Sequence, residues 1–214
     1  MALKVQVFSD YVCPYCFLAE GPLSEAVAEL DGEVEVEWMA FELRPHPTPM
    51  LEPEGSYLQN GWRDSIYPLA EKMGVHIVLP RVSPQPYTRL AFEGALFARD
   101  HGKADAYNHR MFTAFFQDEL DIGNADVLTD CAEGLGLNAQ EYRAALDDGT
   151  YSEECGEQLR LSREVLGINS VPTFVIDSRF GIPGMVPKET LVTVFREQLA
   201  SPRDDGGQGR SRRG

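Results

Sequence analysis

The stretch Phe8–Phe17 has the sequence FSDYVCPYCF and lies between two different hydrophobic patterns. Before it, apolar and polar residues alternate from Leu3 to Phe8, which is typical of a β-strand. After it, apolar residues recur at helical spacing from Leu18 to Leu30. The Cys-Pro-Tyr-Cys motif within this stretch is therefore predicted to lie where a strand ends and a helix begins.

A helix start is a favourable place for cysteine chemistry. The free N–H groups and the positive end of the helix dipole stabilise a thiolate relative to a thiol. Pro14 suits the first helical turn, where no N–H group is needed. We therefore expect Cys13 to be exposed at the tip of the helix as the nucleophile. Cys16, one turn further on, is then placed to close a disulfide with it.

Two cysteines at this spacing also occur as half of a zinc site. Zinc needs four ligands, and the sequence has no second close pair of Cys or His residues. The histidines are scattered along the chain at His46, His76, His101 and His109. The strand before the motif and the helix after it favour a redox pair, and we predict no metal site.

Composition excludes several classes of function. The chain has 214 residues, of which 43% are hydrophobic, so it can bury a full core. Its net charge of −15 disfavours binding to nucleic acid or to an anionic membrane. No apolar run approaches the roughly 18 residues of a membrane span, and no signal-peptide pattern precedes the first strand. We therefore expect a cytoplasmic protein, in which four cysteines are not a disulfide framework.

The remaining elements give the order β-α-β, a block of helices, then β-β-α. Residues 33–41 alternate and are predicted to form a second strand, parallel to the first across the intervening helix. Periodicity and capping residues then predict helices over 56–74 (broken near Pro68), 88–102, 104–116, 125–134, 138–146 and 151–166, strands over 173–176 and 180–182, and a helix over 187–199. The tail over 201–214 has almost no apolar residues and is predicted to be disordered.

Later segments carry a resemblance to a known family. The Cys-Pro-x-Cys motif, the helical insertion and the strand entrance Val-Pro-Thr-Phe at 171–174 together resemble the DsbA family of the thioredoxin superfamily. The phrases FELRP at 41–45, DIG at 121–123 and GINSVPTFVI at 167–176 are similar to its FrnE-like cytoplasmic branch. The resemblance covers nearly all of the chain up to Leu199. It implies an α/β, thioredoxin-like domain made of residues 1–45 and 168–200, interrupted by a helical insertion over 46–167.

The resemblance also implies an activity and its residues. It implies a thiol-disulfide oxidoreductase that forms a mixed disulfide through Cys13, which Cys16 then resolves. The peptide bond before Pro172 is expected to be cis and to face the cysteines, with the Val171 backbone free to pair with an extended substrate segment. Partners are then protein thiols or disulfides, or glutathione as a small redox partner, and no bound cofactor is expected.

The two residues between the cysteines are expected to set the redox potential. Pro14 and Tyr15 influence how well the Cys13 thiolate is stabilised. The same dipeptide occurs in glutaredoxins, so we expect a potential between the superfamily extremes of about −270 and −120 mV.

The chain has two further cysteines, Cys131 and Cys155. FrnE-like proteins can carry an extra cysteine pair near the C-terminus, and here nothing beyond Cys155 is available for one. Both residues lie on or beside the apolar face of a predicted helix, which favours buried and inert thiols. The alternative is a second redox pair, which requires a Cα separation below about 7 Å.

Two rival functions use the same scaffold. Kappa-class glutathione transferases and 2-hydroxychromene-2-carboxylate isomerases resemble this architecture, but they activate the thiol of glutathione with a single polar residue at the position of Cys13. The intact cysteine pair favours the dithiol mechanism over this glutathione-dependent isomerase or transferase. The other rival is a chaperone or binding module that uses the groove beside Pro172 without catalysis.

Overall fold

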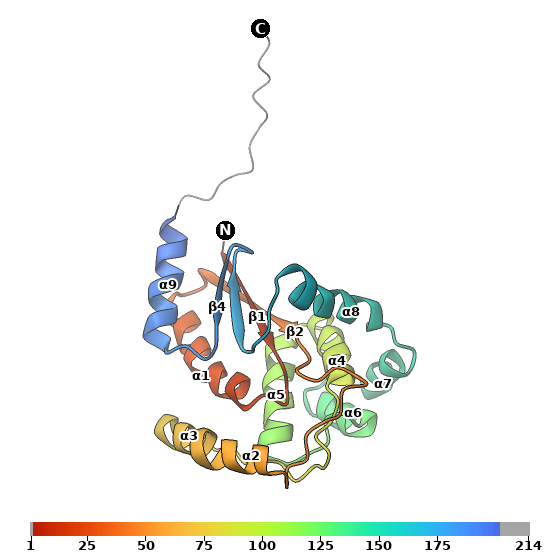
Figure 1. The fold of residues 1–214 in the computed structure, drawn as a ribbon. Coiled ribbons are helices and arrows are strands. Elements are labelled where there is room, and N and C mark those ends of the chain that lie inside the picture. Colours follow the sequence, from red (N-terminus) through yellow and green to blue (C-terminus); the bar gives the residue numbers. More distant parts are fainter. Residues whose placement is uncertain (1, 202–214) are drawn as a thin grey trace.

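The computed structural model describes residues 2–201 and has a four-stranded sheet in the order β2-β1-β3-β4. β1 (Leu3–Ser9) pairs in parallel with β2 (Val34–Ala40). On its other side β1 pairs antiparallel with β3 (Thr173–Ile176), which pairs antiparallel with β4 (Phe180–Pro183). The two ends of the chain therefore complete one sheet, although the helical block separates them in sequence (Figure 1).

The helices follow the predicted order. They are α1 (Pro14–Glu29), α2 (Ser56–Gly61), α3 (Tyr67–Met73), α4 (Arg89–Asp100), α5 (Ala104–Phe116), α6 (Ala125–Gly134), α7 (Ala139–Asp147), α8 (Ser152–Arg160) and α9 (Lys188–Ala200). Local capping explains two of these starts: Asn124 accepts a hydrogen bond from Asp126 N–H, and Asn138 accepts from Gln140 and Glu141 N–H.

Two π-helical turns interrupt the predicted helices. The first, η1 (Trp62–Ile66), ends directly before α3, whose second residue is Pro68. Proline has no N–H group to continue the helical ladder, so the predicted break near it is confirmed. The second, η2 (Leu161–Val165), corrects the prediction of a continuous helix over 151–166. Its N–H to C=O bond runs from Leu166 to Leu161, five residues back, rather than four.

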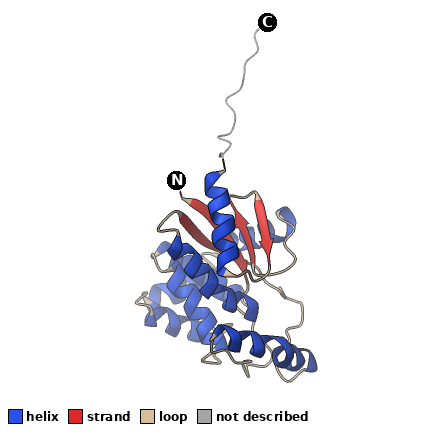
Figure 2. Cartoon of the chain, turned by 90° about the vertical axis from the view of Figure 1, so that its left-hand side faces the viewer, coloured by secondary structure: helices blue, strands red, loops and turns tan. Residues whose placement is uncertain are grey.

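One face of the sheet is buried along β1, and the opposite face is buried only towards the ends of β1 and β2 near the motif. Leu3, Val5 and Val7 alternate along β1 and pack into a core shared with α1 and α9. Phe8 points the opposite way, into a second core formed with the helical block. Figure 2 shows most of the helices gathered on one side of the molecule, with the sheet and α9 beside them.

Aromatic rings dominate this second core. Tyr11 stacks on Phe92 of α4 with ring centroids 4.7 Å apart, and Phe17 of α1 stacks on Phe116 of α5 at 5.7 Å. These rings join the loop before α1, and α1 itself, to helices of the insertion. The helical block therefore packs directly against the elements that carry the two cysteines of the motif.

The C-terminal end of the described chain is α9, and Ser201 N–H bonds to the carbonyl of Glu197 in its last turn. The rest of the predicted tail, 202–214, lies outside the described residues. Between residues 2 and 201, no helix combines the length and the apolar character needed to cross a membrane.

Candidate active site

The Cys-Pro-Tyr-Cys motif lies at the junction between β1 and α1, as predicted. Cys13 is the N-cap of α1, with extended backbone angles, and Pro14 is the first helical residue. The Cys13 carbonyl accepts hydrogen bonds from Cys16 N–H at 3.0 Å and Phe17 N–H at 3.3 Å. The first turn of the helix is thus built on Cys13 and places Cys16 one turn behind it.

The prediction that Cys13 is exposed is wrong. Its side chain is only 4% exposed, because the loop before β3 packs over it. The Cys13 thiol donates a 3.6 Å hydrogen bond to the carbonyl oxygen of Val171, 158 residues further along the chain. In contrast, Tyr15 between the two cysteines is exposed to solvent.

The loop that covers Cys13 is held by β4. The peptide bond between Val171 and Pro172 is cis. The carbonyl of Pro172 accepts a 2.7 Å hydrogen bond from Gly184 N–H, just after β4. Since β3 follows immediately and pairs with β1, the sheet brings Val171 and Pro172 to the dithiol.

Cys16 is fully buried behind Cys13. Burial raises its pKa well above the ordinary value, and the hydrogen bond and charge of Cys13 raise it further. The Ser9 hydroxyl and the Asp10 backbone N–H act in the opposite direction and lower this pKa. Cys16 is therefore a thiol at neutral pH, with two hydrogen-bond donors near its sulfur.

Asp10 is a buried acid that the sequence reasoning missed. Desolvation by burial raises its pKa to about 6, and three donors oppose this shift. Its carboxylate accepts from Leu43 N–H at 2.7 Å, Thr88 Oγ1 at 2.8 Å and Val12 N–H at 3.5 Å. Asp10 thereby ties the loop before α1 to the segment after β2 and to the start of α4. Only its place three residues before Cys13 could have drawn attention to it, because two of its partners are distant in sequence.

The other two cysteines lie in different surroundings. Burial raises the pKa of Cys131, and the charged groups that act on it include Arg110 and Asp118. Burial also raises the pKa of Cys155, to about 12, and there the neighbours include Arg89 and Glu93. All four cysteines are free thiols, and the charged groups with the largest effects on the pKa of Cys131 differ from those at Cys155. Both residues are buried, as inert thiols would be, and the second redox pair stays a prediction.

Among residues 2–201, no group of three or more His, Cys, Asp and Glu side chains is arranged to hold a metal ion.

The sheet order, the flanking helices and the motif at the start of α1 define the thioredoxin-like class of α/β proteins. A family model, that of the DSBA-like thioredoxin domain, matches residues 4–196. The chain belongs to this family, which confirms the DsbA-family prediction. The finer assignment to the FrnE-like branch stays a prediction.

Comparison with individual proteins agrees with this assignment. The chain is 46% identical over 199 residues to YwbO of Bacillus subtilis, covering 92% of this chain and 98% of that protein. A crystal structure of a probable DsbA oxidoreductase from Streptomyces coelicolor superposes with a TM-score of 0.81 at 23% identity, covering 97% of this chain and 94% of the other. A 2-hydroxychromene-2-carboxylate isomerase superposes with a TM-score of 0.71 at 17% identity, covering 92% and 94%. At these identities the two structures establish the fold.

Proposed function

We propose that this protein is a thiol-disulfide oxidoreductase in which Cys13 is the nucleophile and Cys16 the resolving cysteine. The observation that carries the proposal is the contact between the Cys13 sulfur, at the N-cap of α1, and the backbone carbonyl of Val171. This contact puts a reactive group and the entrance to β3 at one place. A substrate segment bound along that backbone would bring its own sulfur to Cys13.

The reaction proceeds in two exchanges. The Cys13 thiolate attacks a substrate disulfide and forms a mixed disulfide, and one substrate thiolate leaves. Cys16 then attacks the Cys13 sulfur, which releases the second substrate thiol and leaves the intramolecular disulfide. The same steps in reverse transfer a disulfide to a substrate dithiol. Pro14 and Tyr15 are proposed to tune the equilibrium between these directions.

The surroundings of Cys13 favour extended, partly apolar substrates. Tyr15 and Leu43 are both exposed large hydrophobic residues, and the backbone N–H of Leu43 bonds to Asp10 in the loop before Cys13. We propose protein thiols or disulfides as substrates and glutathione as a small redox partner. The four free cysteines fit the reducing conditions of the cytoplasm, where we propose that the protein works.

Two single substitutions test the proposal. Reduced wild-type protein should reduce insulin disulfides in the presence of glutathione, and Cys13→Ser should abolish this turnover because no nucleophile remains. Cys16→Ser should retain one exchange and accumulate a mixed disulfide with glutathione, detectable as one added glutathione by mass spectrometry. Cys131→Ser is the matched control and should turn over like the wild type. Turnover that survives in Cys13→Ser contradicts the proposal.

The same variants separate the rival functions. A glutathione-dependent isomerase uses the thiol of glutathione itself, so its activity would be unchanged in Cys16→Ser. Our proposal instead expects loss of disulfide turnover in this variant. A pure binding module would bind an unfolded protein without any turnover that depends on Cys13.

A further inference from the structure

Ser9 is a buried polar residue next to the dithiol. It is the last residue of β1, and its carbonyl accepts a hydrogen bond from Phe41 N–H at 3.0 Å. Its side chain is 2% exposed, yet its hydroxyl makes no hydrogen bond of ordinary geometry to any residue between 2 and 201. Most buried hydroxyl groups in proteins have a partner, so one without a partner calls for an explanation.

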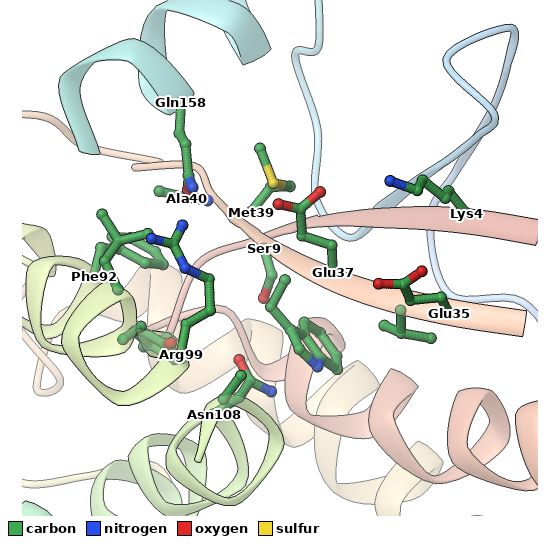
Figure 3. A pocket seen from close by; sticks show the side chains of 16 residues that line it. Lys4, Ser9, Glu35, Glu37, Met39, Ala40, Phe92, Arg99, Asn108 and Gln158 are labelled. Atoms are coloured by element: carbon green, nitrogen blue, oxygen red, sulfur yellow. Dashed lines mark hydrogen bonds between the residues drawn. The ribbon is translucent and has the colours of Figure 1, made fainter. Parts of the chain in front are cut away.

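The Ser9 hydroxyl faces two features at once. One is the Cys16 thiol, whose pKa it lowers. The other is a cavity of about 250 Å³ between the sheet and the helical block. Figure 3 shows Ser9 in the wall of this cavity, with Arg99 of α4 and Asn108 of α5 on the opposite side. A cavity of this size with polar side chains in its wall has room for water.

Cys16 needs a stabilising group during the second exchange. It must become a nucleophile in the second exchange, although burial opposes its ionisation. A hydroxyl that donates to the developing sulfur anion offsets part of this cost, since hydrogen bonds to charged acceptors are the stronger ones. In the resting thiol state the same hydroxyl has little to donate to, which accounts for the missing partner.

Resting on the function proposed above, we propose that Ser9 is a catalytic residue for the resolving step, where its hydroxyl donates a hydrogen bond to the Cys16 sulfur. In that step Cys16 Sγ attacks Cys13 Sγ and the bond between them forms. The bond from Cys13 to the substrate sulfur breaks, and its electron pair leaves on the substrate. The proton lost by Cys16 ends on the departing thiolate. The dithiol is oxidised and the substrate disulfide is reduced, with no other reactant.

The test follows the two exchanges separately. Reduced protein is mixed with excess oxidised glutathione, the reaction is quenched with acid, and mass spectrometry measures the glutathionylated and the internally oxidised forms over time. Ser9→Ala should form the glutathione adduct at the wild-type rate. Its conversion to the internal disulfide should slow about tenfold, so that the adduct accumulates. A purely structural role for Ser9 would slow both exchanges or neither.

An isosteric pair controls for shape. Ser9→Thr and Ser9→Val add the same volume beside the cavity and differ by one hydroxyl, so the first should resolve quickly and the second slowly. Ser162→Ala removes another buried hydroxyl, which donates to the carbonyl of Leu159, and should resolve like the wild type.

Two outcomes count against the inference, and they are distinguishable. A wild-type protein that forms no adduct at Cys13 overturns both the proposed function and the role of Ser9. A wild type that turns over, together with equal resolving rates in Ser9→Thr and Ser9→Val, overturns the role of Ser9 alone.

Discussion

Asp10 shows how a single buried acid is held beside a reactive centre. Its carboxylate is fully enclosed and accepts hydrogen bonds from two backbone N–H groups and the hydroxyl of Thr88. These bonds recover part of the solvation that burial removes, but burial remains the largest effect and the pKa rises to about 6. Above that pH the loop before Cys13 is therefore held by a buried anion.

This raised pKa makes stability depend on pH in a defined direction. Between the ordinary value of 3.8 and about 6, the folded protein binds the proton more tightly than the unfolded chain. The free energy of unfolding therefore falls as the pH rises through this window, and Asp10 adds no further change above it. The expected loss is about 3 kcal/mol at 1.36 kcal/mol per pKa unit.

Asp10→Asn should remove this dependence. Its amide can still accept from Leu43 N–H and can donate to the Thr88 hydroxyl. Urea unfolding of both proteins between pH 4 and pH 8 isolates the effect, because every other titrating group is common to them. Relative to Asp10→Asn, the free energy of unfolding of the wild type should fall as the pH rises to about 6. Above that pH the difference between the two proteins should stay constant. A constant difference across the whole range would contradict the raised pKa.

At Gly94, α4 packs closely against α5 and α7. A Cβ atom at this position would lie 2.0 Å from the Tyr142 hydroxyl and 2.4 Å from the Tyr107 hydroxyl. These two hydroxyls hydrogen-bond to each other at 2.6 Å in the core. Only glycine leaves room for this tyrosine pair against α4.

Gly94→Ala should therefore destabilise the protein by about 2–3 kcal/mol, since overpacking a closed core outweighs the gain in helix propensity. The matched control is Gly134→Ala in α6, where no atom lies within 4 Å of the added Cβ. That variant should be neutral or more stable by up to about 1 kcal/mol. Thermal unfolding of the two variants measures both effects, and equal melting temperatures would refute the close packing.

One ion pair joins the helix of the dithiol to the helical block. His109 of α5 lies 3.0 Å from Glu20 of α1, and this hydrogen bond raises the histidine pKa. A raised pKa stabilises the fold below the ordinary value of 6.5, and the contribution disappears as the pH rises through the folded pKa. Because the histidine side chain is 65% exposed, solvent screening keeps the contribution below about 1 kcal/mol.

His109→Gln should accordingly be less stable than the wild type at pH 6 and equal to it near pH 8.5. Chemical denaturation at the two pH values is sufficient. Glu20 keeps its bond from the Asn108 amide in both proteins, so the comparison reports the histidine charge. A deficit of the same size at both pH values would assign the effect to packing instead.

Sequence alone predicted the elements well and their surroundings less well. The features that were predicted correctly depend on local capping, turn and propensity signals. They are the helix starts at Asn124 and Asn138, the end of α6 at Gly134 and the strand Thr173–Ile176. The burial of Cys13 depends on Val171, and that of Asp10 on Leu43 and Thr88. No local pattern encodes such contacts between residues that are distant in sequence. The resemblance to the family predicted only that Val171 lies near Cys13.

At the scale of the whole molecule, net charge should select among small substrates. A charge of −15 gives the protein a negative field that attracts cations and repels anions before any contact forms. The field extends about 30 Å at 0.01 M salt and only about 3 Å at 1 M. Substrate charge should therefore matter most in dilute buffer, through the rate of encounter with Cys13.

Cystamine and 3,3′-dithiodipropionate test this, because they differ mainly in carrying two positive or two negative charges. For each of the two disulfides, the rate of reaction with the reduced protein is divided by the rate of its reaction with 2-mercaptoethanol, a neutral reference thiol. At 0.01 M salt this normalised rate should be at least about tenfold higher for cystamine than for 3,3′-dithiodipropionate. The ratio should fall towards one as salt is raised to 1 M, because screening removes the field but not the chemistry. A ratio that salt does not change would mean that groups in direct contact with the substrate, rather than the overall charge, set the preference.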